Sequence, residues 1–193
     1  MRRVCVFCGS SDGADPAYRE AGRQLGKLLA EEGLGLVYGG GSIGVMGAMA
    51  DAALVGKGEV IGVIPEVLQI KERGHKGLTD LRVVGSMHER KALMAELADG
   101  FVALPGGMGT LDEFCEIVTW AQLGLHAKPC GLLDVKGYFG PFVDFIDRAV
   151  AQGFVRVEHR ALIHVDSDAQ RLLDRMRRQQ VQPSQRWIGK EQT

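Results

Sequence analysis

Short apolar runs alternate along the chain with longer stretches in which apolar residues recur every three or four positions. The short runs, rich in β-branched residues, predict strands near residues 3–8, 33–39, 59–65, 81–84, 100–104, 129–133 and 162–165. The periodic stretches predict helices near residues 17–32, 44–55, 87–98, 111–124, 141–152 and 168–178. Strands that are apolar on both faces and separated by helices indicate a parallel sheet covered on both sides. The pattern therefore predicts one doubly wound, mostly parallel, Rossmann-like α/β domain.

The predicted domain occupies residues 1–178, and the polar, proline-interrupted segment 179–193 is expected to be a tail. A chain of 193 residues is long enough for one domain with a substantial core. Its formal net charge of -1 gives no electrostatic reason to expect nucleic acid or an anionic membrane as a partner. No apolar run reaches the roughly 18 residues of a membrane span, and the first run, of about five residues, is shorter than a signal-peptide core. A cytoplasmic protein is expected.

Four cysteines are present, and two of them, Cys5 and Cys8, form a CxxC pair. No second pair or Cys/His cluster completes a zinc site, so no metal is expected. Both residues fall in or at the end of the first predicted strand, where small buried thiols are common. Core packing is the favoured interpretation of this pair, ahead of redox chemistry.

The predicted architecture places ligands beyond the carboxyl ends of the strands, in the loops that lead into helices. Five such loops are expected, over residues 9–16, 39–44, 65–77, 85–90 and 105–110. Glycine is concentrated in them, as a close approach between backbone and ligand requires. These loops are therefore the first place to look for chemistry.

The loop at 39–44 fits the pattern GxGxxG that binds dinucleotides. It follows the second strand instead of the first, and Glu66, near the distance at which an acid would be expected, lies just past a proline. A loop that holds a phosphate or nucleotide is favoured, with Gly40, Gly41 and Ser42 as binding candidates. A true dinucleotide site and simple turn glycines stay open as alternatives.

The loop PGGMGT at 105–110 has no Gly-Lys-Ser/Thr and is not a Walker A loop. Its glycines would let successive backbone N–H groups face an anion at the start of the next helix, and Thr110 adds a hydroxyl donor. However, Thr110 and Glu113 also have the spacing of a capping box, in which they would only close the helix terminus. Spacing alone does not decide between a capped helix and an anion site.

The helix that follows has two apolar faces. At 100° per residue, one stripe faces the sheet and comprises Leu111, Phe114, Cys115, Val118, Ala121 and Leu125. Glu113, Glu116 and Trp120 project from the opposite side, flanked by Ile117 and Leu123. Because two acids and a tryptophan beside apolar residues are unlike a face exposed only to water, we expect a partner subunit there. The predicted assembly is a homodimer with Glu113 near the shared cleft.

Arg90 continues the buried stripe of the preceding helix, which includes Leu93 and Met94. A buried guanidinium requires an anion. That anion is a carboxylate such as Glu113 in a structural salt bridge, or a ligand phosphate that suits the planar fork of arginine. Lys91 points about 100° away and could supply a second positive charge. His88 and His75 lie in glycine-containing loops, and for each of them a surface position and a catalytic role both stay open.

Three segments, PGGMGTLDE, MHERK and YGGGSIGVMG, together resemble the signature of the Lonely Guy family of cytokinin riboside 5'-monophosphate phosphoribohydrolases. The resemblance extends from CVFCGSS to about residue 165, and three motifs in order are more specific than any single glycine loop. Members of this family are often labelled lysine decarboxylases. A Schiff-base lysine for pyridoxal phosphate cannot be identified in the sequence.

The resemblance implies hydrolysis of the N-glycosidic bond of AMP or an N6-substituted AMP, without a cofactor. It implies that Arg90 and Glu113 are catalytic. The implied substrate-binding residues are Glu72, Met87, Lys91, Gly106, Gly107, Met108, Gly109, Thr110 and Thr119. Asp112 stands where the family pattern usually has glutamate.

This chemistry suits the residues independently. Cleavage of the C1'–N9 bond passes through an oxocarbenium-like ribosyl cation, which a carboxylate can stabilise while it orients water. The main alternative is a carrier that binds a nucleotide or cofactor on the same fold without catalysis. A carrier would not need both Arg90 and Glu113, so their joint presence favours an enzyme. A dinucleotide-dependent oxidoreductase is a third, disfavoured interpretation.

Overall fold

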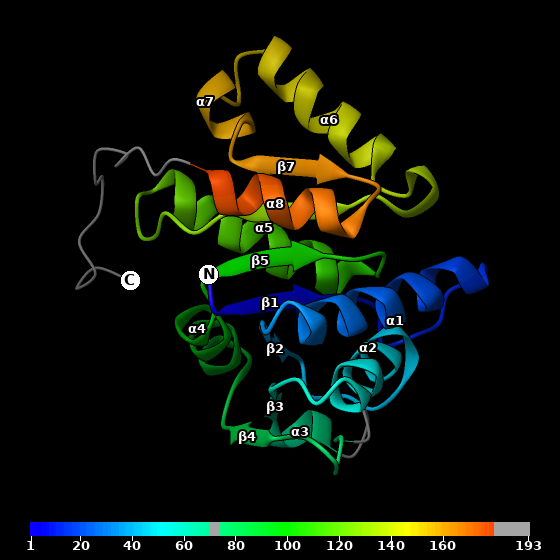
Figure 1. The fold of residues 1–193 in the computed structure, drawn as a ribbon. Helices are drawn as coiled ribbons and strands as arrows, with labels where there is room; N and C mark the ends of the chain where they lie inside the picture. The colour runs from blue at the N-terminus through cyan, green and yellow to red at the C-terminus, as the bar shows by residue number, and fades with distance from the viewer. Residues whose placement is uncertain (70–73, 180–193) are drawn as a thin grey trace.

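The computed structural model describes residues 1–69 and 74–179 and contains one seven-stranded sheet with helices around it (Figure 1). The strands are β1 (Arg3–Phe7), β2 (Gly35–Tyr38), β3 (Val60–Pro65), β4 (Asp80–Val84), β5 (Gly100–Ala103), β6 (Cys130–Leu133) and β7 (Ile163–Asp166). The longer helices are α1 (Pro16–Glu31), α2 (Gly44–Val55), α4 (Met87–Leu97), α5 (Met108–Gln122), α6 (Gly140–Ala151) and α8 (Ala169–Arg178). Three short elements complete the described chain: α3 (Glu66–Gln69), the 3₁₀ turn η1 (Val135–Gly137) and α7 (Val157–Arg160).

The sheet is parallel throughout, in the order β4-β3-β2-β1-β5-β6-β7, from bottom to top in Figure 1. Strand β1 pairs with β2 on one side and with β5 on the other, so Val4 lies opposite both Leu36 and Gly100. The chain reverses its direction across the sheet at this point, which is where doubly wound folds bind ligands. The α/β fold predicted from the apolar pattern is confirmed.

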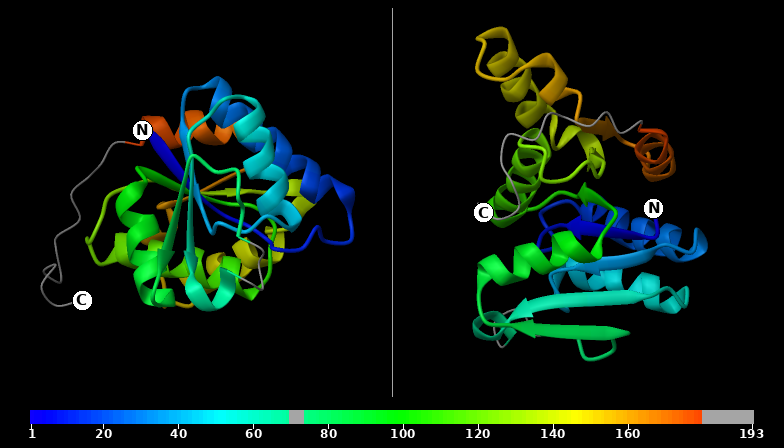
Figure 2. Two further views of the ribbon diagram at one scale, coloured as in Figure 1. Left: turned by 90° about the horizontal axis from the view of Figure 1, so that it is seen from below. Right: turned by 90° about the vertical axis from the view of Figure 1, so that its left-hand side faces the viewer.

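Helices cover both faces of the sheet. Alternate residues of β1 point to opposite sides: Val4 and Val6 pack in a core with residues of α1, α2 and α8, while Cys5 and Phe7 pack with residues of α4 and α5. Figure 2 shows the helices on the two sides of the sheet. This double burial explains why the strand segments are nearly continuous apolar runs in the sequence.

Helix α5 differs from its prediction in two ways. It begins at Met108, three residues earlier than expected, with Gly107 as its N-cap and no side-chain hydrogen bond at the cap. Thr110 therefore lies inside the first turn, so the capping-box interpretation is wrong. Its buried residues are Thr110, Phe114, Ile117, Val118 and Ala121, whereas Cys115 is exposed. The buried stripe is rotated by about 50°, half of the turn per residue, because Thr110 and Ile117 occupy inward positions.

The CxxC pair is part of the core, as predicted. Cys5 and Cys8 are buried free thiols, and burial raises the pKa of each. Within residues 1–69 and 74–179 there is no group of three or more His, Cys, Asp or Glu side chains arranged to hold a metal ion. In the same residues, no helix combines the length and the apolar character of a membrane span.

Candidate active site

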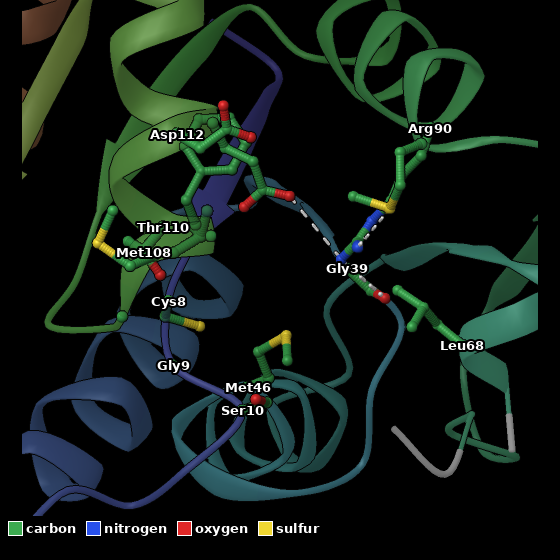
Figure 3. A pocket seen from close by; sticks show the side chains of 16 residues that line it. Cys8, Gly9, Ser10, Gly39, Met46, Leu68, Arg90, Met108, Thr110 and Asp112 are labelled. Atoms are coloured by element: carbon green, nitrogen blue, oxygen red, sulfur yellow. Dashed lines mark hydrogen bonds and ion pairs between the residues drawn. The ribbon is translucent and has the colours of Figure 1, made fainter. Parts of the chain in front are cut away.

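A cavity of about 360 Å³ opens beyond the carboxyl ends of β1 and β2, where the start of α5 faces the start of α4 (Figure 3). We call it the main cavity. It is lined by Val6, Phe7, Cys8, Gly9, Ser10, Gly39, Met46, Leu68, Met87, Arg90, Gly107, Met108, Gly109, Thr110, Asp112 and Glu113. In Figure 3, Arg90 approaches from one side, and Met108, Thr110 and Asp112 stand on the other. The cavity lies at the switch point of the sheet, as the fold predicted.

The first turn of α5 forms one wall of the main cavity. Strand β5 ends at Ala103, and α5 starts after Gly107 without a side-chain cap. The first N–H groups of a helix have no intrahelical acceptor, so those of Met108, Gly109 and Thr110 depend on another partner. Together with the positive end of the helix dipole they form a binding site suited to an anion.

The glycines at the start of α5 are required for different physical reasons. A Cβ at Gly106 would lie 2.1 Å from Thr110 Oγ1 and 2.8 Å from the backbone nitrogen of Gly9, so packing requires glycine there. A Cβ at Gly107 or Gly109 would have no atom within 4 Å. No protein atom crowds these two positions, so a ligand can approach the backbone closely there.

Arg90 occupies the opposite wall and is only 5% exposed. Helix α4 is capped by the Ser86 side chain, which accepts from the backbone N–H of Glu89, and Arg90 follows in the first turn. Its Nη2 donates to the carbonyl of Gly39 at 3.4 Å and lies 3.9 Å from Glu113 Oε1. Its buried Nε makes no hydrogen bond with any described residue. The contact with Glu113 is long for an ion pair, and the remaining donor is available to a ligand.

The carbonyl of Gly39 holds Arg90 only because position 39 is glycine. A Cβ there would lie 2.1 Å from Arg90 Nη2. Tyr38 steadies the same loop, since its buried hydroxyl donates to the carbonyl of Gly41. The loop at 39–44 therefore contributes to the cavity through Gly39, its first glycine, which places Arg90.

Glu113 lies in the second turn of α5, and its carboxylate is about one-tenth exposed. It points into the same cavity as Arg90. The Cys8 thiol also lines the cavity, and its pKa is raised mainly by its own burial and further by the negative charge of Glu113. The cavity is thus lined by the guanidinium of Arg90, the carboxylates of Glu113 and Asp112, and the neutral thiol of Cys8.

Of the residues predicted to bind substrate, five line the main cavity: Met87, Gly107, Met108, Gly109 and Thr110. Gly106 lies behind this wall and accepts a hydrogen bond from the Tyr138 hydroxyl. Gly40, Gly41 and Ser42 stand next to the lining residue Gly39 without being part of the lining. Glu72 falls outside the described residues.

Lys91 and Thr119 lie elsewhere in the single chain. Lys91 Nζ is 2.7 Å from Asp112 Oδ2 and 3.1 Å from Glu116 Oε2, so it joins α4 to α5. Partial burial lowers the pKa of Lys91, but the two carboxylates outweigh it and the net change is upward. Thr119 donates its hydroxyl to the carbonyl of Cys115. Neither residue lines the main cavity of its own chain.

The sequence did not single out several lining residues. Gly9 and Ser10 come from the loop after β1, which was predicted to face the ligand without any residue being chosen. Met46 comes from α2 and Leu68 from the short helix α3. Met46 falls within the motif YGGGSIGVMG, but its apolar side chain gave no reason to choose it, and no motif marks Leu68.

Comparison with known proteins gives a consistent family assignment. The family described as "Possible lysine decarboxylase" matches residues 46–176. The rice protein named "Probable cytokinin riboside 5'-monophosphate phosphoribohydrolase LOGL9" (Oryza sativa subsp. japonica) is 54% identical over 176 residues, which is 91% of this chain and 78% of the relative. Cytokinin riboside 5'-monophosphate phosphoribohydrolase LOG of the same plant is 52% identical over 84% of this chain and 67% of the relative. The Arabidopsis thaliana enzyme LOG7 is 49% identical over 90% of this chain and 80% of the relative.

Solved structures share the fold at lower identity. The molybdenum cofactor carrier protein from Chlamydomonas reinhardtii superposes with a TM-score of 0.69 at 22% identity, covering 92% of this chain and 96% of that one. The molybdenum cofactor binding protein from Rippkaea orientalis gives 0.68 at 20% identity with the same coverage. At these identities the similarity concerns the fold alone.

Proposed function

Because this chain belongs to the family of cytokinin riboside 5'-monophosphate phosphoribohydrolases, we propose that it hydrolyses the N-glycosidic bond of a nucleoside 5'-monophosphate. Water adds across the C1'–N9 bond, and the products are the free base and ribose 5-phosphate. The substrate is AMP or an N6-substituted AMP, in keeping with the names of the relatives. This activity agrees with the reaction expected from the three sequence motifs.

One observation carries the proposal: the uncapped start of α5 and the buried guanidinium of Arg90 face each other across one cavity. A phosphate monoester satisfies both, because backbone N–H groups at a helix start and a guanidinium fork are both well suited to bind phosphate. Binding the phosphate remote from the reacting bond fixes the ribose. Nucleosides without phosphate should therefore be poor substrates.

Glu113 is the residue that we propose acts on the reacting carbon. A carboxylate near C1' stabilises the ribosyl cation and orients or activates the attacking water. Arg90 beside it favours the ionised form of that carboxylate. The two residues have complementary roles, which explains why they approach each other from opposite walls of one cavity.

The label lysine decarboxylase does not suit the site. Decarboxylation of lysine with pyridoxal phosphate requires a lysine that forms a Schiff base. No lysine is among the described residues that line the main cavity. The nearest one in sequence to the catalytic pair, Lys91, is engaged by Asp112 and Glu116.

The proposal includes a homodimer. A groove of about 900 Å³ runs between α4 and α5, and we call it the α4–α5 groove. It is lined by His88, Lys91, Ala92, Ala95, Glu96, Glu116, Trp120, Leu125, His126 and Lys128. A half-buried tryptophan with apolar neighbours and ion-paired charges supports coverage by a second copy.

Lys91 and Thr119, implied as substrate ligands by the family resemblance, stay predictions. So does a cytoplasmic location.

The activity is tested by incubating the protein with AMP and with N6-isopentenyl-AMP, followed by chromatography for the free base and ribose 5-phosphate. Release of base in a molar ratio of one with ribose 5-phosphate is expected. Adenosine serves as the control substrate and should release base much more slowly. If AMP binds in calorimetry but no base is released, the protein is a nucleotide carrier on this fold.

A further inference from the structure

Tyr138 touches the loop before α5 from outside the main cavity. It follows the 3₁₀ turn η1 after β6, and its hydroxyl donates to the carbonyl of Gly106 at 2.5 Å. It is not among the described residues that line the cavity. The residue is 40% exposed, so its hydroxyl could be hydrated equally well by water. This hydrogen bond is therefore not needed to satisfy a buried tyrosine.

The bond fixes the orientation of one peptide group. In a planar trans peptide, the carbonyl and the N–H on the two sides of the bond point in opposite directions. Tyr138 holds the carbonyl of Gly106, so the N–H of Gly107 points away from Tyr138. Gly107 itself lines the cavity. The peptide between two glycines has little steric resistance to rotation as a unit, and a reversed peptide would present a carbonyl oxygen where an anion must bind.

The position of Tyr138 is well defined by its neighbours. Its ring packs edge-on against Tyr18 at a centroid distance of 5.5 Å and against Phe139 at 5.1 Å. Phe139 is 1% exposed, and its backbone N–H donates to Asp134 Oδ1. The aromatic contacts hold the ring independently of the hydroxyl. Removal of the oxygen alone should therefore leave the ring in place.

We propose that Tyr138 is a positioning residue that keeps the Gly106–Gly107 peptide oriented with its N–H available to the substrate phosphate. The hydrogen bond also polarises this peptide, which strengthens the N–H as a donor. This inference rests on the proposed function, because it assumes that the site binds a phosphate monoester. Tyr138 acts through the loop and does not touch the substrate.

The test compares Tyr138→Phe with Tyr18→Phe, a matched loss of one hydroxyl from the ring that packs edge-on against it. Within residues 1–69 and 74–179 the Tyr18 hydroxyl makes no hydrogen bond, although the charge of Lys136 interacts with it. The dissociation constants of AMP, ribose 5-phosphate and adenosine are measured by calorimetry at the same pH, and thermal melting is followed for each variant. Steady-state hydrolysis of AMP gives KM and kcat separately.

Tyr138→Phe should weaken AMP and ribose 5-phosphate by about fivefold, the scale of one net hydrogen bond, and leave adenosine unchanged. KM should rise by a similar factor with kcat nearly constant, and Tyr18→Phe should behave like the unmodified protein. Equal losses for AMP and adenosine, or unchanged binding of both phosphates, would overturn the inference. Binding of ribose 5-phosphate does not require catalysis. A protein that binds AMP and ribose 5-phosphate but does not hydrolyse AMP would therefore refute the proposed hydrolase activity, while the binding constants of the two tyrosine variants would still decide the role of Tyr138.

Discussion

Arg90 and Glu113 are each costly to bury alone and are placed where each offsets the other. The 3.9 Å between Arg90 Nη2 and Glu113 Oε1 is near the upper end of the N···O distances of ion pairs, about 4 Å. Arg90 Nε has no partner among the described residues. An arrangement made only for stability would close this contact and satisfy that donor. The long contact and the unpaired Nε support the proposal that a ligand completes this pair.

Replacing Glu113 by glutamine tests its role. Because Glu113 is not part of a capping box, the change leaves the start of α5 intact, and the melting temperature should fall only by what Arg90 loses with its long contact to this carboxylate. Turnover of AMP should fall by at least about 10²-fold, the scale of a positioned acid/base group. The comparison is made between kcat and thermal melting of the same preparation.

Glu116→Gln is the matched control, since Glu116 lies one turn further along α5 and outside the main cavity. It should retain most of the turnover. A Glu113→Gln protein that keeps full turnover but melts far below the unmodified protein would assign Glu113 a structural role.

Gly39 offers a second test at the residue scale, through the position of Arg90. An added Cβ would lie 2.1 Å from Arg90 Nη2, the end of a flexible side chain, so the guanidinium should move and the fold should survive. Such a displacement should lower kcat/KM for AMP by about 10²-fold. Circular dichroism and melting should change little.

Gly140→Ala is the control, because a Cβ at Gly140 meets no atom within 4 Å at a site distant in the sequence from both walls. It should leave kcat/KM unchanged. If Gly39→Ala retains normal kinetics, the placement of Arg90 by this loop is not needed for activity.

At the scale of the elements, Lys91 joins α4 to α5 by contacts with Asp112 and Glu116. The two acids are one helical turn apart, so the removal of the cation leaves like charges facing each other. Lys91→Met should lower the free energy of unfolding by about 1 kcal/mol, a modest value because Asp112 is largely exposed. Urea denaturation measures it.

The same variant distinguishes two roles for Lys91. An interhelical role predicts that added salt reduces the difference in stability between Lys91→Met and the unmodified protein. It also predicts that Lys91→Met together with Asp112→Asn is less than additive. A role in substrate binding predicts a higher KM for AMP without loss of stability. That second outcome would support the contact implied by the family resemblance.

The elements themselves were largely predictable because their apolar patterns are strong. All seven predicted strands and the six longer helices are present, with ends shifted by a few residues. The start of α5 was missed because Gly107 takes the cap position without a side chain, whereas Thr110 had the better capping chemistry. The weaker cap leaves the first N–H groups of α5 without a side-chain acceptor, as the proposed anion site requires. Short elements such as α3 and α7 carry too few residues for a periodic signal.

At the scale of the molecule, the main cavity depends on segments that are far apart in sequence. The sequence indicated which loops lie at the carboxyl ends of the strands, and the inward position of Arg90 followed from helical spacing. The contacts of Gly39 with Arg90 and of Tyr138 with Gly106 could not be predicted. Each joins segments that follow different strands, so each depends on the order of the strands in the sheet, and the first depends also on where α4 packs. The resemblance supplied the reaction, which residue spacing alone left undecided.

The homodimer is tested at this scale through the α4–α5 groove. If a second copy covers it, the protein should have twice its chain mass of 20.9 kDa in light scattering at micromolar concentration. Trp120→Glu places a charge among apolar neighbours of the groove and should shift the mass to that of one chain. Val55→Glu, at the exposed end of α2, is the control and should leave the mass unchanged. If activity falls together with dimerisation in Trp120→Glu, while its melting stays cooperative, the partner subunit supports the site. An unmodified protein that is monomeric and fully active would refute both the assembly and its part in catalysis.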